Sequence, residues 1–199
     1  MNKQGQTPIS LVVLALAALL AGCAGGPMPP DWQLDARAAL QGFEKHYLEG
    51  NTKVAEAEFA RAKDQLRKTG RGDLLARAEL VRCAARTASL EFDDCPGFEA
   101  LRRDAGAEEL AYAEYLAGRG KHSVTEGALS RLVAAGVVFR TATITPAQIA
   151  AAVELASAQG WRRPLLAWLG VEEVRAAAAG DRDALERIRR RIALVSGKA

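Results

Sequence analysis

Histidine, proline, cysteine and aromatic residues are all scarce in this chain of 199 residues. Three cysteines are too few for a small disulfide-stapled toxin, and seven prolines are too few for a collagen-like chain. A strong excess of one charge sign is also lacking, because 27 Lys and Arg residues face 24 Asp and Glu residues. This balance excludes a disordered polyanion and argues against a nucleic-acid partner. Alanine, at 41 residues, is abundant and favours helix throughout.

The uncharged run at the N-terminus is too short to be a permanent membrane anchor. It covers 12 residues, Ile9–Leu20, whereas a bilayer-spanning helix needs about 20. Lys3 precedes the run, and the small residues Ala21 and Gly22 follow it. This arrangement predicts a cleaved export signal over residues 1–22.

The end of this signal resembles, residue for residue, the lipobox of bacterial lipoproteins, with Leu20-Ala21-Gly22-Cys23 in sequence. The resemblance implies that the Cys23 sulfur receives a diacylglyceryl group, that cleavage falls before Cys23 and that the new amino terminus is acylated. Two or more acyl chains anchor a protein stably, whereas one binds only marginally. The expected partner of Cys23 is therefore the lipid bilayer; the alternative is an ordinary secretory signal with a chance cysteine.

Residues 23–31 are expected to form the acylated cysteine and a flexible tether rich in Gly and Pro. Ala24 stands where, in the sorting rule of enteric bacteria, an Asp retains a lipoprotein at the inner membrane. Its absence implies the outer membrane, facing the periplasm, with the inner membrane as the alternative. The rest of the chain, residues 32–199, is expected to be a helical periplasmic domain.

The two remaining cysteines are expected to pair. Export places Cys83 and Cys95 in an oxidising compartment, where disulfides are the default. A bridge between them closes a short loop and is worth about 3 kcal/mol in the chain-entropy model. A nucleophilic cysteine or a zinc site is disfavoured, because neither position has the histidine partners that such sites use.

Apolar residues recur at helical spacing through most of residues 32–199, which predicts an all-α stack of helical hairpins. Val137–Thr145 is rich in Val, Thr and Phe; because one strand cannot make a sheet, we expect an extended connector there. Thr52, Asp73, Thr145 and Asp181 are expected to cap the helices that follow them. The helices are expected at 32–49, from 52 to about 69, 73–89, 98–105, 108–117, 124–135, 146–159, 164–169, 171–179 and from 182 onward.

The first two of these helices resemble a tetratricopeptide repeat over roughly 34 residues. The resemblance rests on Tyr47-Leu48-Glu49-Gly50-Asn51 and on the Ala55, Phe59 and Ala62 that follow. In that family, small and aromatic residues at these offsets let the second helix nest against the first. The repeat is degenerate: Gly42-Phe43 replaces the usual Leu-Gly pair, Arg67 stands where a Pro often closes the repeat, and no second copy follows.

The sequence matches known catalytic and ligand-binding motifs only weakly. Gly118–Ser123 resembles a phosphate-binding loop but lacks the earlier Gly and the Ser or Thr after the Lys, so we expect a basic helix end. His46 is expected to be packed and hydrogen-bonded, and neither His46 nor His122 is expected to be catalytic. The carboxylates around the Cys95 turn are expected to belong to a solvated loop, with a weak cation site as the alternative. These are Glu91, Asp93, Asp94 and Glu99.

Two candidate contact surfaces remain. The first is a partner groove on the first helical hairpin, around Phe43, Tyr47 and Phe59. The second is the basic side of the last helix, which would contact lipid head groups or an acidic partner; the alternative is a solvated face. Its candidate residues are Arg187, Arg190 and Arg191. Trp161 and Trp168 are expected to be core anchors, with an exposed platform as the alternative.

These observations together predict a non-enzymatic adaptor or accessory protein of the bacterial cell envelope. Helical hairpin stacks bury one face on their neighbours and offer another to a helix or peptide. No catalytic residue, metal site or cofactor is expected, and the partner is an envelope protein of unknown identity. The alternatives are a small glycan-acting enzyme that uses a helix-borne carboxylate and a passive structural lipoprotein.

Overall fold

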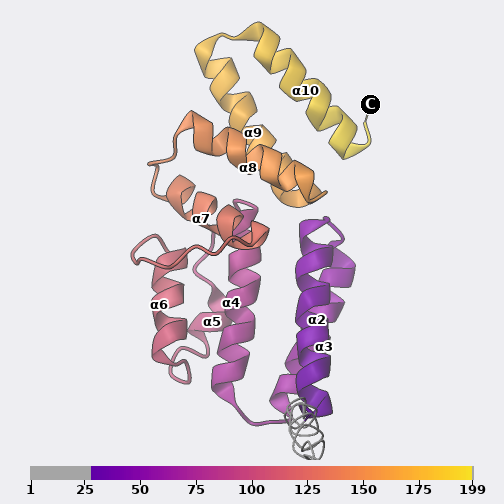
Figure 1. Cartoon of the computed structure of the whole chain (residues 1–199), viewed down its shortest axis with the longest axis vertical. Coiled ribbons are helices and arrows are strands. Elements are labelled where there is room, and N and C mark those ends of the chain that lie inside the picture. Colours follow the sequence, from indigo (N-terminus) through magenta and orange to yellow (C-terminus); the bar gives the residue numbers. More distant parts are fainter. Residues whose placement is uncertain (1–27, 199) are drawn as a thin grey trace, which may run out of the picture. The chain divides into compact units, whose positions relative to one another are not determined.

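The structure, a computed structural model, describes residues 28–198, and within this range every regular element is an α-helix (Figure 1). This confirms the predicted all-α class with stacked helical hairpins. None of the helices in the described range is both long enough and apolar enough to cross a membrane. The helices are α2 (Asp31–Leu48), α3 (Thr52–Arg67), α4 (Gly72–Ala88), α5 (Pro96–Glu99), α6 (Ala107–Leu116), α7 (Ala128–Arg140), α8 (Pro146–Ala158), α9 (Arg162–Ala179) and α10 (Arg182–Ser196).

The predicted export signal, Cys23 and all but the end of the tether lie outside the described residues. Residues 28–30 are non-helical and exposed, and α2 begins at Asp31. Residues from Asp31 onward form one unit. The first helical residue of this unit, Asp31, thus comes one position before the expected start at Trp32.

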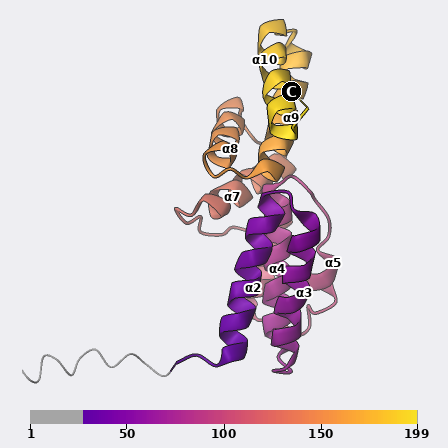
Figure 2. The same ribbon diagram turned by 90° about the vertical axis from the view of Figure 1, so that its right-hand side faces the viewer.

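Helices α2 and α3 form an antiparallel hairpin, which Figures 1 and 2 both show. The connection is short because Gly50 adopts a left-handed conformation, with φ of +87°, which a glycine reaches without the strain of a Cβ. Phe43 and Phe59 pack ring against ring between the two helices, with 5.0 Å between ring centroids. Small residues at Ala55 and Ala62, both completely buried, let the helices approach closely.

Helix α4 lies between this hairpin and the rest of the helices, which explains its high alanine content. Ala78 and Ala85 face the core of the α2–α3 hairpin. Ala76, Ala84 and Ala88 face a second and larger core built with α5 to α9. A helix buried on two sides can accept neighbours at short distance only if its side chains are small.

The C-terminal helices follow one another in antiparallel order, α7 against α8, α8 against α9 and α9 against α10 (Figures 1 and 2). Thr145 and Gln148 form the predicted capping box at the start of α8, and the Asp181 carboxylate accepts the predicted bond from the Ala184 N–H at 2.9 Å. Trp168, completely buried, anchors α9 and donates its indole N–H to the Ala88 carbonyl of α4 at 3.1 Å. This confirms Trp168 as a core anchor; Trp161 is only half-buried at the start of α9.

Several local predictions were wrong. Val137–Arg140 is the last turn of α7, not an extended connector, because Val137 is buried in the core. Residues 162–179 form one helix, since Gly170 does not break α9. Thr52 and Asp73 lie inside the first turns of α3 and α4 and cap neither helix. Helix α5 is limited to Pro96–Glu99, and α7 begins only at Ala128.

Candidate functional site

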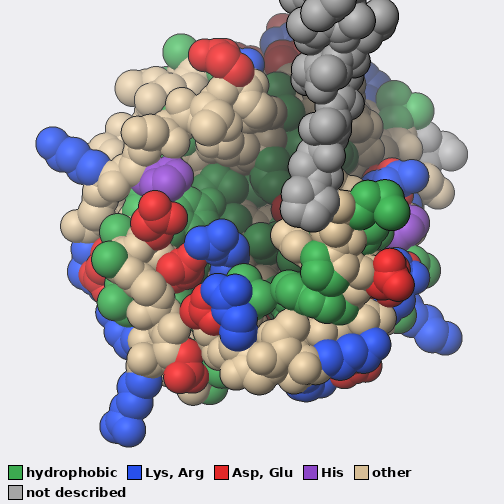
Figure 3. Space-filling model, turned by 60° about the horizontal axis from the view of Figure 1, so that its bottom comes forward, with side chains coloured by type: hydrophobic (Ala, Val, Ile, Leu, Met, Phe, Trp, Pro, Cys, Tyr) green, Lys and Arg blue, Asp and Glu red, His purple; other side chains and the backbone are tan. Residues whose placement is uncertain are grey.

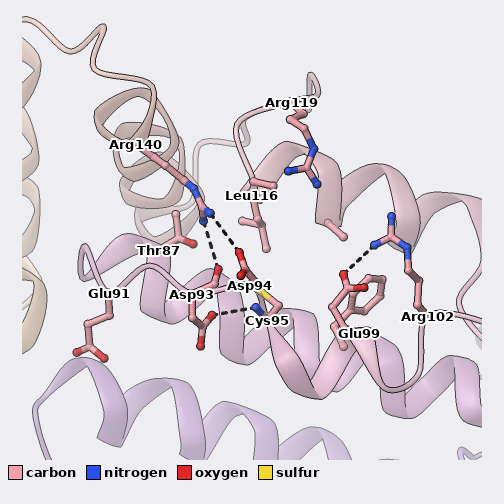
Figure 4. Close-up of a pocket in the computed structure, with 13 residues that line it drawn as sticks. Thr87, Glu91, Asp93, Asp94, Cys95, Glu99, Arg102, Leu116, Arg119 and Arg140 are labelled. Carbon is pink, nitrogen blue, oxygen red and sulfur yellow. Dashed lines mark hydrogen bonds and ion pairs between the residues drawn. The ribbon is translucent and has the colours of Figure 1, made fainter.

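A polar hollow of about 310 Å³ lies between the turn after α4 and the helices α5, α6 and α7 (Figure 4). Charged side chains of both signs surround an apolar base that includes Leu116 and Phe98. The charged residues that line it are Glu91, Asp93, Asp94, Glu99, Arg102, Arg119 and Arg140.

The predicted bridge between Cys83 and Cys95 holds one wall of this hollow. Cys83 comes from α4 and Cys95 from the turn, and their sulfurs lie at disulfide distance with Cα atoms 5.8 Å apart. The turn is shaped further by the Asp93 carboxylate, which accepts the Cys95 N–H at 3.0 Å, and by Pro96 at the start of α5. Asp93 and the two sulfurs lie close together, but sulfurs bonded to each other are not thiolate ligands for a metal.

The two aspartates of the turn differ in their surroundings. Asp93 pairs with Arg86 of α4 at 2.9 Å. Asp94 is fully exposed, as expected for a solvated loop, and lies 3.9 Å from the guanidinium of Arg140. Arg140 also donates to the Asp93 backbone carbonyl at 3.4 Å, and Figure 4 shows it reaching down from α7 to the turn. The turn is therefore held from α4 and α7 at once.

Glu114 of α6 organises the other side of the hollow. It accepts hydrogen bonds from Arg119 at 2.6 Å and from Arg102 at 3.0 Å. These bonds, the Arg119 bond foremost, lower the pKa of Glu114 to about 2. Arg102 also pairs with Glu99 at 2.8 Å. A carboxylate held in this way stays ionised at neutral pH and has no proton to give to a substrate.

The glycine-rich segment beside the hollow is a helix end, as predicted. Helix α6 ends at Leu116, and Gly118 takes a left-handed φ of +78°. His122 then packs against two tyrosines of α6, with ring centroids 4.7 Å from Tyr112 and 5.3 Å from Tyr115. His122 is exposed, and the segment agrees with the expected basic helix end.

The partner groove predicted around Phe43, Tyr47 and Phe59 is wrong. Phe43 is completely buried, and Tyr47 and Phe59 are exposed by only 4% and 2%. The three rings form the core between α2 and α3. Aromatic residues at helical spacing have the same pattern whether they face a partner or a core, so the sequence did not separate the two cases.

Tyr47 instead belongs to a network that joins distant parts of the chain. Its hydroxyl donates to Glu91 at 2.7 Å, and burial together with this bond raises its pKa. Arg163 of α9 donates to the Tyr47 carbonyl at 2.8 Å, pairs with Glu91 at 3.0 Å and lies 4.2 Å from the centre of the Tyr47 ring. The Arg163 guanidinium also reaches the Thr52 hydroxyl. One side chain thus joins α9 to α2, α3 and the turn after α4.

The predicted basic residues of α10 do not act as one group. Arg190 pairs with Glu186 on its own helix at 3.5 Å. Arg191 pairs with Glu154 of α8 at 2.9 Å. Arg187 is exposed and forms no ion pair in the described part of the chain. Arg187 and Arg191 line a second hollow, whereas Arg190 does not.

Sequence reasoning missed the arginines of the first hollow and the junction at Arg163. Among them, only Arg102 carried a local signal, because it follows Glu99 by three residues in a helical stretch. Arg140 and Arg163 find their partners through the packing of separate helices, and Arg86 pairs with Asp93 of the turn that follows its own helix. Helical spacing along the chain predicts none of these contacts.

Comparison with known proteins identifies no relative: no family model, no curated protein and no solved structure matches the chain. The functional argument therefore rests on the residues themselves.

Proposed function

We propose that this chain is a lipid-anchored protein of the bacterial cell envelope. Its signal peptide, residues 1–22, is removed, and Cys23 carries a diacylglyceryl group and an acylated amino terminus. The protein is anchored in the outer membrane and faces the periplasm. The support for this address is the four-residue match to the lipobox, followed by a segment rich in Gly and Pro and by a domain that begins at Asp31.

The domain acts by binding another envelope protein, as an adaptor or accessory subunit with a degenerate tetratricopeptide-like hairpin at its start. The observation that carries this role is the pairing of charges in the hollow beside the disulfide. Asp93, Glu99 and Glu114 all accept bonds from or pair with arginines. Such carboxylates maintain a shape and an electrostatic pattern, which suits recognition, and are poor proton donors.

The address is tested by replacing the acylated sulfur. In cells, Cys23→Ser should abolish labelling with a radioactive fatty acid and release the protein from the membrane fraction. Ala24→Asp is the matched control at the next residue: acylation should persist, while the enteric sorting rule predicts a shift to the inner membrane. A Cys23→Ser protein that still labels and still sediments with membranes would refute the lipid anchor.

The adaptor role is tested by crosslinking in intact cells, followed by capture of the full chain and identification of attached proteins. One envelope protein should be recovered reproducibly, and its recovery should fall when surface charges are changed in a folded variant. Photo-crosslinking residues can be placed on every exposed helix face of the chain. If the chain is abundant and correctly anchored but no other protein becomes crosslinked to it, the adaptor proposal fails.

A glycan-acting enzyme remains the second candidate because of one side chain. Burial raises the pKa of Glu44 on α2, and a carboxyl with a raised pKa is what a general acid requires. Burial raises the pKa of Tyr112 to about 12, and the charges of Tyr115 and Glu44 add to this increase. Glu44→Gln keeps the shape and removes the proton donor, so it would abolish glycan cleavage by the purified chain if this candidate were correct. The adaptor proposal expects no cleavage by either protein.

A further inference from the structure

The second hollow lies near the C-terminal end of the domain and differs in charge from the first. It has a volume of about 490 Å³ and is built by the first turn of α8, the middle of α9 and one face of α10. Three arginines and one glutamate line it, whereas the hollow beside the disulfide has three arginines and four acidic residues. The cationic residues are Arg175, Arg187 and Arg191.

The arginines of this hollow are only partly neutralised. Arg175 and Arg187 are exposed, and neither forms an ion pair within residues 28–198. Arg191 alone has a partner, Glu154, at 2.9 Å. The single acidic residue of the lining, Glu172, is half-buried, and burial raises its pKa. The α8 N-terminus at the same hollow adds a partial positive charge.

Apolar side chains also line this hollow. Ile188 follows Arg187 on α10 and is only half-buried. Pro146 is exposed on α8, and Leu169 lies completely buried beneath. Arg187 and Arg191 are four residues apart and therefore on one side of α10, about one helical turn from each other. The hollow thus combines an apolar base with guanidinium groups at the spacing of a helical turn.

We propose that this hollow is the docking site for an acidic amphipathic segment of a partner protein. The segment places an apolar side chain on Ile188 and Pro146, and its carboxylates bind Arg175 of α9 and Arg187 of α10. Guanidinium groups suit carboxylates because they offer paired donors in a plane. The inference rests on the proposed adaptor function and deepens it by naming the surface and the chemistry of the partner.

The position of the hollow favours a protein segment over a lipid head group of the anchoring membrane. The end of α2 meets the start of α9, where Arg163 binds the Tyr47 carbonyl. Helix α2 has 18 residues, so its first turn, where the tether joins, is about 27 Å from that junction. The hollow lies beyond the junction, on residues 169–175 of α9. Figures 1 and 2 place α10 and the start of α2 at opposite ends of the domain.

Binding is tested on the full chain, extracted from membranes in a nonionic detergent. The probe is a fluorescein-labelled peptide of Glu and Leu at helical spacing, followed by fluorescence anisotropy, and its Lys and Leu counterpart is the control peptide. The acidic peptide should bind, and binding should weaken as salt is raised because exposed charges are screened. No binding by the acidic peptide, or equal binding by both peptides, would overturn the proposal.

Two double variants locate the site. Arg175→Gln with Arg187→Gln should raise the Kd about tenfold, since two exposed charge contacts are lost. Arg189→Gln with Arg190→Gln removes the same charge but from residues that pair with Glu173 and Glu186 away from the hollow. The control variant should keep its affinity within about twofold. Equal losses in both variants would mean nonspecific attraction and would overturn the site; circular dichroism checks that both remain folded.

Vesicles of phosphatidylglycerol and phosphatidylcholine distinguish the lipid occupant. If the Arg175 and Arg187 variant loses vesicle binding while peptide binding is unaffected, the hollow is a lipid site and the proposal is wrong. In cells, a photo-crosslinking residue at Ala184 should capture a protein through an acidic segment, identified by mass spectrometry. Crosslinks that form elsewhere on the domain but not at Ala184 would overturn this surface and leave the adaptor function intact.

Discussion

The packing of α7 against α4 makes a quantitative prediction at Gly136. A Cβ at this position would lie 2.3 Å from the Thr87 carbonyl oxygen and 3.0 Å from its carbonyl carbon. Backbone atoms cannot turn away as a flexible side chain does, so Gly136→Ala must push the two helices apart. Overpacking of this kind costs about 3 kcal/mol at the upper end of its usual range. Replacing glycine by alanine within a helix returns about 1 kcal/mol, which leaves a net destabilisation of about 2 kcal/mol.

Gly170 supplies the matched control. It also lies inside a helix, α9, but a Cβ there would meet no atom within 4 Å. Gly170→Ala should therefore stabilise the protein by about 0.5–1 kcal/mol, through helix preference alone. The same chemical change is expected to have opposite signs at the two positions.

Thermal and urea unfolding of the two variants, followed by circular dichroism, measure the difference. For a chain of this size, 1 kcal/mol corresponds to about 2–4 °C in Tm. Gly136→Ala should thus lower Tm by about 4–8 °C, and Gly170→Ala should raise it by about 1–4 °C. If both substitutions raise Tm, α7 does not approach the α4 backbone at Gly136 as closely as the structure places it.

Three further substitutions or treatments test other parts of the structure. Reducing the Cys83–Cys95 bridge, with a sequence separation of 12, should lower the free energy of unfolding by about 3 kcal/mol; two thiols that label in denatured, unreduced protein would contradict the bridge. Trp168→Phe removes the indole bond to the buried Ala88 carbonyl and should cost about 1–3 kcal/mol in urea unfolding, and a neutral result would refute the bond. The pKa of Glu114 is lowered from 4.5 to about 2, so its contribution to stability is present above about pH 4.5 and is lost as the pH falls toward 2. Glu114 is exposed and the contribution is small, so the direct check is an NMR titration of its carboxyl, in which Arg119→Gln should move the pKa back toward 4.5.

The first hollow has nearly balanced charges and the second is cationic, and the reason for this difference is where their arginines find partners. Beside the disulfide, Arg140 and Arg102 meet acidic residues from the turn and from α5 and α6. At the second hollow, Arg175 of α9 and Arg187 of α10 form no ion pair within residues 28–198. On the face that Figure 3 shows, basic and acidic side chains are interspersed and do not gather into a patch of one sign. Arg175 and Arg187, which form no ion pair within residues 28–198 and lie beside an apolar base, differ from the mixed charges on that face.

Local patterns predicted the helices and two of their caps. Thr145 and Asp181 cap as expected because the capping residue, the turn and the helix are all adjacent in sequence. The disulfide was also predictable, since the expected export and a short separation leave two cysteines few alternatives. The local rules failed at Val137 and Gly170. β-branched residues favour strands only weakly, and burial of Val137 outweighs that preference. Gly170 costs the helix about 1 kcal/mol, which the buried Trp168 and Leu169 beside it offset.

The candidate sites were less predictable than the fold, and Arg163 shows the physical cause. It lies 116 residues from Tyr47 and 72 from Glu91, yet contacts both. No periodicity along the chain encodes such a contact, because it arises only after α9 has packed against α2. The same applies to the burial of Phe43, whose pattern suits a core and a partner surface equally well. The sequence does show an excess of positive charge on α10, which has five arginines and two acidic residues. Arg189, Arg190 and Arg191 form ion pairs, whereas Arg182 and Arg187 form none within residues 28–198. Arg187 lines the second hollow, where an acidic partner would find a charge still free to bind it.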